Sequence, residues 1–302
     1  MRHRLPILIA SILLGIEAVP ALTFNAQEGE TSFGFLKFSL SPRSIALAGS
    51  GTALVNNVAD IDLNPAAAAR DPGGIALGQG YLPFATTANF VSWNIPWNDQ
   101  RITAQARYLG FDNTAGYDVL DRSTTAYGAH TLKFQAGTAG KLTGFAYGAS
   151  MAYAQNNVAD VTYSAGLLNA GLWYELPAGF SAGFSLLNAD FWTSNAQDGS
   201  PIIPPTSVQA GVSYSRNIPG HTKISVAVDA RKRNDEKFAV PVGVEACWQN
   251  ILSVRAGYPI SEPEASPTFG VGLHWLRYGF DYAYQGNAVL SGTHFWALEI
   301  NY

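Results

Sequence analysis

Eight residues near the C-terminus decide the fold: Tyr278-Gly279-Phe280-Asp281-Tyr282-Ala283-Tyr284-Gln285. Every second residue is aromatic, and small or polar residues occupy the positions between. Because successive side chains of a β-strand point to opposite faces, this run predicts a strand with one apolar and one polar face. The same alternation recurs in residues 223–229, 238–248 and 268–275. The last third of the chain is therefore predicted to be a series of strands.

The second face of these strands indicates their surroundings. The strands of a water-soluble β-sandwich also alternate apolar and polar residues, but their polar faces contact solvent and are rich in Lys and Glu. In this sequence the polar face is mostly Gly, Ala, Ser and Thr. Tyr and Trp end several apolar rows, among them Trp248, Tyr258 and Trp275, as in the aromatic girdles of membrane interfaces. The pattern favours a barrel whose apolar faces meet lipid and whose small residues line a lumen.

The composition supports a membrane barrel. Only 13% of the 302 residues are charged, compared with about 25% in soluble domains. No apolar run of about 18 residues follows the first two dozen, which excludes a helical span and leaves a closed barrel. The net charge of -4 argues against nucleic acid as a partner. The single cysteine, Cys247, cannot form an internal disulfide.

The N-terminus has the pattern of a secretory signal. Arg2 and Arg4 precede an apolar stretch, residues 5–16, and Val19-Pro20-Ala21 forms a small-residue cleavage site. We therefore expect residues 1–21 to be a signal peptide that exports the protein toward the bacterial outer membrane. Residues 22–72 are then an N-terminal hatch, and residues 73–302 are the transmembrane β-barrel.

Counting alternating segments gives an antiparallel barrel of about fourteen strands. The predicted strands are 73–81, 86–95, 101–109, 126–135, 141–153, 161–174, 179–187, 206–215, 222–230, 238–248, 252–258, 267–275, 277–285 and 293–302. An even number returns both ends to the periplasm, where turns are short, while outer loops are longer. The short connections are predicted at 96–100, 136–140 and 216–221, and the long ones at 110–125, 188–205, 259–266 and 286–292. A phase shift near Leu167 and Leu168 predicts a bulge.

The C-terminal strand resembles the assembly signal of outer-membrane barrels. Trp296, Leu298, Ile300 and Tyr302 alternate with small or polar residues, and the chain stops on an aromatic. In such barrels the final strand usually ends on Phe and is recognised by the barrel assembly machinery. We therefore expect that machinery and outer-membrane lipid to be partners.

Residues 33–72 lack this alternation. Ser41-Pro42 has the pattern of a helix cap followed by a first-turn proline, and this helix is predicted to end at Gly49. Asn64-Pro65 is a second start of the same kind, and Asp71-Pro72-Gly73 ends that helix. A lumen of about fourteen strands is wider than its own side chains can fill. The segment is therefore predicted to be a hatch inside the barrel, with a periplasmic extension as the alternative.

This segment resembles the N-terminal signature of the PorV/PorQ family. The residues that carry the resemblance are Phe35-Leu36-Lys37, Ser41, Arg43, Ser44, Ala48-Gly49, Val55 to Asp60 and Asn64-Pro65-Ala66. The related FadL-type transporters look similar around Asn-Pro-Ala. The stretches 163–167, 171–174 and 183–188 are nearer to the PorQ branch. The resemblance implies a fourteen-stranded barrel with a hatch and an accessory role in type IX protein secretion or surface attachment.

Two other functions stay open beside that role. The barrel could be a FadL-like channel for uptake of hydrophobic small molecules, or a structural outer-membrane protein. For a secretion accessory, the segments 259–266 and Phe191-Trp192 are the candidate contact surfaces.

No enzymatic or cofactor pattern stands out in the sequence. The five histidines lack the spacing of a metal pair, and neither a Gly-x-Ser-x-Gly elbow nor a phosphate-binding loop occurs. We therefore expect no catalytic residues, no metal and no cofactor.

Two groups of residues are candidates for a site. Arg43, Gly49, Asp60, Asn64, Pro65 and Ala66 form the family motif of the hatch. Charged residues predicted to face the lumen are Lys223, Asp229, Glu245, Arg255, Arg277 and Asp281. Pairing among these charges is favoured over substrate binding. Arg43 either clamps a carboxylate or ties the hatch to the wall, and Asn64 is first a helix cap.

Overall fold

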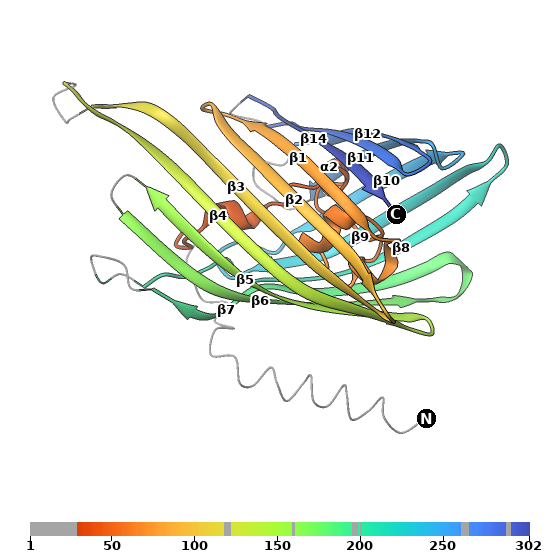
Figure 1. Cartoon of the computed structure of the whole chain (residues 1–302). Coiled ribbons are helices and arrows are strands. Elements are labelled where there is room, and N and C mark those ends of the chain that lie inside the picture. The colour runs from red at the N-terminus through yellow and green to blue at the C-terminus, as the bar shows by residue number, and fades with distance from the viewer. Residues whose placement is uncertain are drawn as a thin grey trace.

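The structure, a computed structural model, describes residues 29–117, 122–158, 161–194, 199, 201–260, 266–287 and 291–302. Fourteen antiparallel strands form one closed barrel in which each strand pairs with its sequence neighbours and β1 pairs with β14 (Figure 1). The predicted fold class is confirmed. The predicted signal peptide, residues 1–21, and residues 261–265 of the proposed contact loop lie outside the described residues.

Within the described residues, the secondary structure consists of fourteen strands, four short helical elements in the N-terminal segment and one helical turn between two strands. Helical elements within the described residues are η1 (Gly34–Lys37), α2 (Pro42–Ala46), η2 (Val58–Asp62), α3 (Ala67–Arg70) and η3 (Pro177–Gly179). The strands are β1 (Gly74–Leu82), β2 (Thr86–Trp97), β3 (Gln100–Tyr117), β4 (Ser123–Leu142), β5 (Phe145–Val158), β6 (Val161–Glu175), β7 (Phe180–Thr193), β8 (Ser207–Ile218), β9 (Thr222–Arg233), β10 (Val240–Trp248), β11 (Leu252–Ile260), β12 (Thr268–Trp275), β13 (Tyr278–Gln285) and β14 (Thr293–Asn301). Within the described residues, no helix is long and apolar enough to cross a membrane.

The apolar face of each strand points out of the barrel. Phe280 and Leu298 remain 40% and 48% exposed, and no second sheet among the described residues covers them. Large exposed hydrophobic side chains recur on every strand, which in a barrel marks the surface that meets lipid. The opposite positions are buried and mostly small, as Ala76, Ala283 and Ala297 illustrate.

Several strands are longer than predicted. β3 and β4 extend over 100–117 and 123–142, so the predicted loop 110–125 is wrong, as is the predicted turn 136–140. Gly137 and Ala139 occupy inward positions of β4, where small residues suit a crowded inner face, and Gly140 also pairs within the strands. The alternation of connections remains: those after even-numbered strands are tight, such as 98–99, 143–144 and 276–277. In outer-membrane barrels the end with the tight turns faces the periplasm, so we call this end the periplasmic end.

The predicted bulge is present where β6 pairs with β7. The register shifts between Gly166 and Leu167, and again between Leu168 and Ala170. On the β7 side, Asn188 has a φ of 57°. These two shifts interrupt an otherwise regular wall, and bulges of this kind bend a strand and increase its twist.

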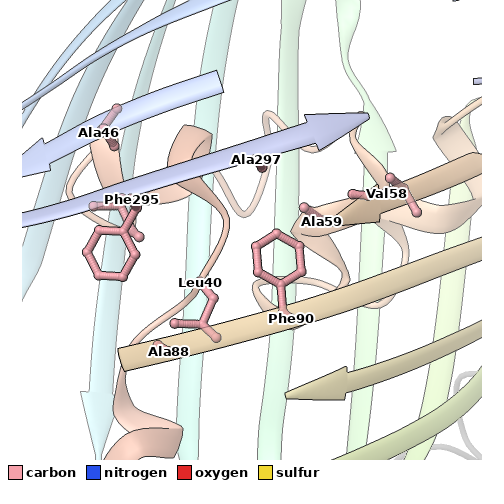
Figure 2. Close-up of a cluster of buried hydrophobic side chains, with 11 residues drawn as sticks. Leu40, Ala46, Val58, Ala59, Ala88, Phe90, Phe295 and Ala297 are labelled. Carbon is pink, nitrogen blue, oxygen red and sulfur yellow. The ribbon is translucent and has the colours of Figure 1, made fainter. Parts of the chain in front are cut away.

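Residues 29–73, which we call the hatch segment, lie inside the ring of strands (Figure 1). Its helix α2 packs against β11 to β14, and α3 packs against β3 to β5. Figure 2 shows Leu40 and Val58 of this segment beside Phe90 of β2 and Phe295 of β14. The segment thus bridges the first and last strands of the wall from within.

Inward glycines allow the hatch backbone to touch the wall. A Cβ at Gly257 would lie 2.5 Å from the carbonyl carbon of Leu47, and one at Gly270 would lie 2.5 Å from the Cβ of Ala46. Cβ atoms at Gly148 and Gly183 would likewise collide with hatch backbone. The small inner face predicted from the sequence is therefore the surface on which the hatch packs.

Candidate functional site

A cavity lies in the lumen on the extracellular side of the hatch segment. Its volume is about 250 Å³. The wall contributes residues of β3, β4, β7 to β9 and β11 to β13, and the hatch segment contributes residues 36–39, 44–45, 48–49 and 62–63. Apolar side chains of Leu36, Phe38, Ile45, Leu63 and Leu187 line part of it. The cavity is slightly smaller than pockets for drug-sized ligands, so it suits a small molecule.

Basic side chains outnumber acidic ones in the described lining of the same cavity. Its lining includes five basic side chains, Lys37, Arg107, Lys133, Arg231 and Arg233, and one acidic side chain, Asp62. Asp235 and Glu236 add two negative charges just outside the lining. Basic side chains therefore outnumber acidic ones by five to three among these described residues, and Arg231 has a further partner.

Asp62 is the shared partner of two of these cations. Its Oδ2 lies 3.1 Å from Arg107, and its Oδ1 lies 3.3 Å from Lys133. All three side chains are almost fully buried. Arg107 also donates to the carbonyl of Phe38 at 2.8 Å, which holds the hatch chain to β3. Since one carboxylate serves two cations, the cavity wall can accept a further anionic group.

Lys37 forms a second contact between hatch and wall. Its Nζ lies 2.5 Å from Asp235 in the loop after β9, and Thr31 also donates to that carboxylate. Burial alone would raise the pKa of Asp235, but these two hydrogen bonds and the charge of Lys37 outweigh it and lower the pKa. The contact therefore persists at neutral pH.

A buried ion-pair network holds the hatch segment on the periplasmic side of this cavity. Arg43 donates to Glu245 of β10 through Nε at 2.9 Å and to Asp60 through a terminal nitrogen at 2.9 Å. Ser41, the cap of α2, donates to the other oxygen of Asp60. Of the two readings of Arg43, the structure shows it tying the hatch to the wall.

The network continues along the wall. Arg255 of β11 donates to Glu245 at 2.7 Å and pairs with Asp281 of β13. His274 of β12 lies 3.4 Å from Asp281 and 3.8 Å from Glu299 of β14. Adjacent strands place these residues side by side because each occupies an inward position.

Two further side chains bind hatch backbone directly. Asp229 of β9 accepts from the backbone N–H groups of Gly51 and Thr52 at 3.1 and 2.9 Å, and from Gln209. Asn64 donates to the carbonyls of Thr52 and Leu172 at 2.9 and 3.0 Å. Asp229 therefore binds backbone rather than the cationic partner we expected across the lumen.

The helix starts predicted for the hatch differ in detail. Ser41 caps α2 as expected, accepting from the Ser44 N–H at 3.4 Å. Asn64 accepts from the Ala66 N–H at 3.0 Å, but the helix that follows begins only at Ala67, after Pro65. The side-chain NH2 group of Asn64 makes tertiary contacts, and its side-chain oxygen forms an Asx turn that precedes the helix.

The remaining predicted site residues lie outside the buried network. Gly49 follows α2 at a φ of 76°, and its carbonyl accepts from Gln209. Lys223 is exposed near the periplasmic rim, and Arg277 is exposed in the turn between β12 and β13. The C-terminal residues Trp296, Leu298, Ile300 and Tyr302 alternate along the end of β14, and Trp93 donates to the Tyr302 hydroxyl at 2.5 Å.

Sequence reasoning missed several residues of both sites. Asp62, Arg107 and Lys133 were not among the candidates, and neither were His274 and Glu299. The signal that could have found His274 and Glu299 is their parity: both occupy the inward face of strands whose alternation was clear. Asp62 belongs to an aperiodic segment and offers no such signal.

Asp71 lies where the hatch segment enters β1. It is buried, and its Oδ1 accepts from the Gly73 N–H at 2.7 Å and from Asn94 at 2.9 Å. Burial raises the pKa of Asp71 to about 6, although both hydrogen bonds act in the opposite direction. The carboxylate thus titrates close to neutral pH.

An apolar groove lies on the outside of the barrel over β2 to β7. Outward residues of the groove include Trp93, Phe134, Met151, Phe191 and Trp192. Gly166, at the β6–β7 register shift, forms part of its floor, while Leu187 and Asn188 on the same interrupted stretch of β7 line the inner cavity. The outer groove and the inner cavity therefore approach the same irregular section of wall.

Comparison with known proteins identifies solved structures that share this fold. No family model matches the chain, and no curated protein matches its sequence. Among solved structures, a TodX monoaromatic hydrocarbon channel mutant aligns with a TM-score of 0.60 at 12% identity, over 88% of this chain and 99% of its own. The *Ralstonia pickettii* toluene transporter TbuX aligns with a TM-score of 0.60 at 11% identity, over 90% and 100%.

A *Pseudomonas aeruginosa* FadL homologue gives a TM-score of 0.55 at 10% identity, over 87% of this chain and 98% of its own. At such identities the likeness concerns the fold alone. These alignments extend over nearly the full length of the solved structures. The chain has the fold of the FadL-type outer-membrane β-barrels.

Proposed function

We propose that this chain is an outer-membrane channel for small hydrophobic molecules that carry an acidic group. The observation that carries the proposal is the cavity of about 250 Å³, in which apolar side chains adjoin the basic side chains of Lys37, Arg107 and Lys133. Solved structures of the same fold are described as channels for aromatic hydrocarbons, which supports transport. The basic lining distinguishes this cavity as one for an anion rather than a neutral hydrocarbon.

The irregular section of the wall offers a route out of the cavity. Leu187 and Asn188 face the cavity, and Gly166 with Phe191 lies under the outer groove. Two register shifts lie in the wall between these surfaces. Fewer regular hydrogen bonds between strands therefore have to break here than elsewhere in the described wall. We therefore infer that a ligand leaves sideways toward lipid between β6 and β7, since the hatch segment is tied down by buried ion pairs.

Binding is tested with octanoate and octan-1-ol, which share a chain and differ in the carboxylate. The purified barrel in detergent should bind octanoate at least tenfold more tightly by calorimetry. Lys133→Met should weaken octanoate about tenfold and leave octanol unchanged, because Arg107 still pairs with Asp62. Lys223→Met, which removes an exposed lysine at the opposite rim, is the control. Equal binding of both probes would refute an acidic substrate.

The route is tested separately from binding. Ala104→Trp places a bulky side chain in the outer groove, and Ala170→Trp places the same side chain at an exposed position of β6 outside it. In proteoliposomes, Ala104→Trp should slow octanoate uptake several-fold at unchanged affinity, and Ala170→Trp should not. Equal uptake by both variants would contradict a lateral exit at this position.

An accessory role in type IX secretion is the second candidate. It is supported by the family motif, whose residues Arg43, Asp60 and Asn64 are the ones that fix the hatch segment. A hatch held in place suits a barrel that works through protein contacts. Co-purification of secretion components, and loss of surface cargo on gene deletion with octanoate uptake intact, would favour this role. A purely structural protein would show neither phenotype.

A further inference from the structure

A second polar cluster, separate from the cavity, lies at the periplasmic mouth of the lumen. His274, Asp281 and Glu299 project from β12, β13 and β14, and one ligand atom from each lies within 4.8 Å of the other two. The Nε2 of His274 is 3.4 Å from Asp281 Oδ2 and 3.8 Å from Glu299 Oε2. For a Zn²⁺ ion with bonds of about 2.1 Å, tetrahedral ligand atoms stand roughly 3.4 Å apart. The cluster is therefore close to the size of a coordination shell.

The wall keeps space free between two of these side chains. Gly279 is the register partner of both His274 and Glu299 and so lies between them. A Cβ at Gly279 would lie 2.8 Å from Cδ2 of His274 and 3.2 Å from Cβ of Glu299. Glycine at this point lets the imidazole and the carboxylate converge over the sheet.

One ligand atom of the cluster has no hydrogen-bond donor. Asp281 is fully buried, and Oδ1 pairs with Arg255. Its Oδ2 accepts no hydrogen bond from any described residue, and it points toward His274 Nε2. A buried carboxylate oxygen left without a donor is costly. A cation placed between Oδ2 and the imidazole would satisfy it.

Charge balance also favours a cation. The connected network contains four carboxylates and two guanidinium groups, from Asp60, Glu245, Asp281, Glu299, Arg43 and Arg255. With a neutral imidazole, these groups carry a net charge of -2 among the described residues of the network. A divalent ion would neutralise that charge, whereas a protonated His274 would leave one negative charge uncompensated.

We propose that His274, Asp281 and Glu299 form a binding site for a divalent transition-metal ion. Imidazole with two carboxylates suits Zn²⁺ and its neighbours better than Ca²⁺ or Mg²⁺, which take oxygen ligands. His274 is partly exposed, so the ion is reached from the periplasm and keeps a position for water. Asn57 of the hatch segment donates to Glu299 Oε1 at 2.5 Å, so the ion also ties the hatch to the wall.

The test uses the full-length mature barrel, freed of its affinity tag and stripped of metal with EDTA. Zn²⁺ titrated by calorimetry should bind at one ion per chain. His274→Gln and Glu299→Gln should each weaken binding at least tenfold, while His294→Gln, which removes an exposed histidine from the other end of β14, should not. Co²⁺ should give an absorption spectrum typical of nitrogen and oxygen ligands.

Folding is checked by the gel mobility of unheated and boiled samples, so a misfolded variant is recognised. If one glutamine variant misfolds, the other still decides the question. Absence of saturable Zn²⁺ binding to the folded wild type would overturn the site, as would equal weakening by His294→Gln. In those cases His274 completes the network as an imidazolium in an ion pair with its two carboxylates.

Discussion

The two ends of the lumen contain similar residue types and use them differently. Toward the periplasm, Arg43 lies between Glu245 and Asp60, and Arg255 lies between Glu245 and Asp281. Toward the outside, cationic side chains border a cavity of about 250 Å³ instead. Acidic side chains outnumber basic ones in the periplasmic network, and basic side chains outnumber acidic ones around the cavity. Ion pairs hold the hatch at both ends, and the outer end in addition leaves a cavity lined by charged side chains.

The largest expected effect on stability concerns the periplasmic end of the lumen. Arg43→Ala leaves Glu245 and Asp60 as buried carboxylates with fewer partners, which should lower the free energy of unfolding by about 3–5 kcal/mol. Urea unfolding of the reconstituted barrel measures this loss. Arg277→Ala, at an exposed turn, is the matched control and should be neutral. Similar losses in the free energy of unfolding for both variants would contradict the role that we assign to the ion pairs at this end.

The next effect tests whether packing, besides charge, fixes the hatch. Gly257→Ala places a methyl group 2.5 Å from the carbonyl carbon of Leu47, so hatch or strand must shift. We expect a loss of about 1–3 kcal/mol. Gly34→Ala, where nothing lies within 4 Å of the added carbon, should change stability by less than about 0.5 kcal/mol. Unfolding curves of the pair show whether the hatch can be displaced without touching an ion pair.

A pH dependence should come from Asp71 at the base of the hatch. Its folded pKa, about 6, exceeds the usual 3.8, so the folded state loses stability as pH rises through this interval. Asp71→Asn should therefore stabilise the barrel at pH 7.5, on the order of 1 kcal/mol, and have little effect at pH 4. Melting temperatures at both pH values measure it. A loss of stability at pH 7.5 would show that the charged form is needed.

The smallest expected change in stability concerns the cavity at the outer end of the lumen. Lys133→Met removes a cavity cation but leaves Asp62 paired with Arg107, so unfolding should shift by less than about 1 kcal/mol while octanoate binding falls. A stability loss as large as that of Arg43→Ala would show that both ends are structural. The comparison would then have to be abandoned.

Much of the wall was predictable because lipid imposes a period of two on every strand. Strands β10 to β14 lie close to their predicted bounds, and the bulge near Leu167 was visible as a break in phase. The ends of β3 and β4 were not predictable, since small residues such as Ala136 and Gly140 are compatible with both a turn and a strand. Side-chain period alone cannot separate the two.

The site was less accessible from the sequence. Glu245, Arg255 and Asp281 were recognisable as inward charges, and they do pair. Their partner Arg43 lies about two hundred residues away in a segment without periodicity, so the pairing depends on how the hatch enters the barrel. Asp62 and Lys133 converge for the same reason. Such contacts are set by closure of the barrel and leave no local pattern.

The position of the hatch segment constrains the order of assembly. This part of the chain is made before any strand, yet α2 packs against β11 to β14, which are made last. Its charged side chains could hardly thread through a ring already closed between β1 and β14. The wall must therefore close around the plug, and the plug is available as a scaffold for the final strands as they arrive. A barrel deprived of it would be expected to stall with its seam open.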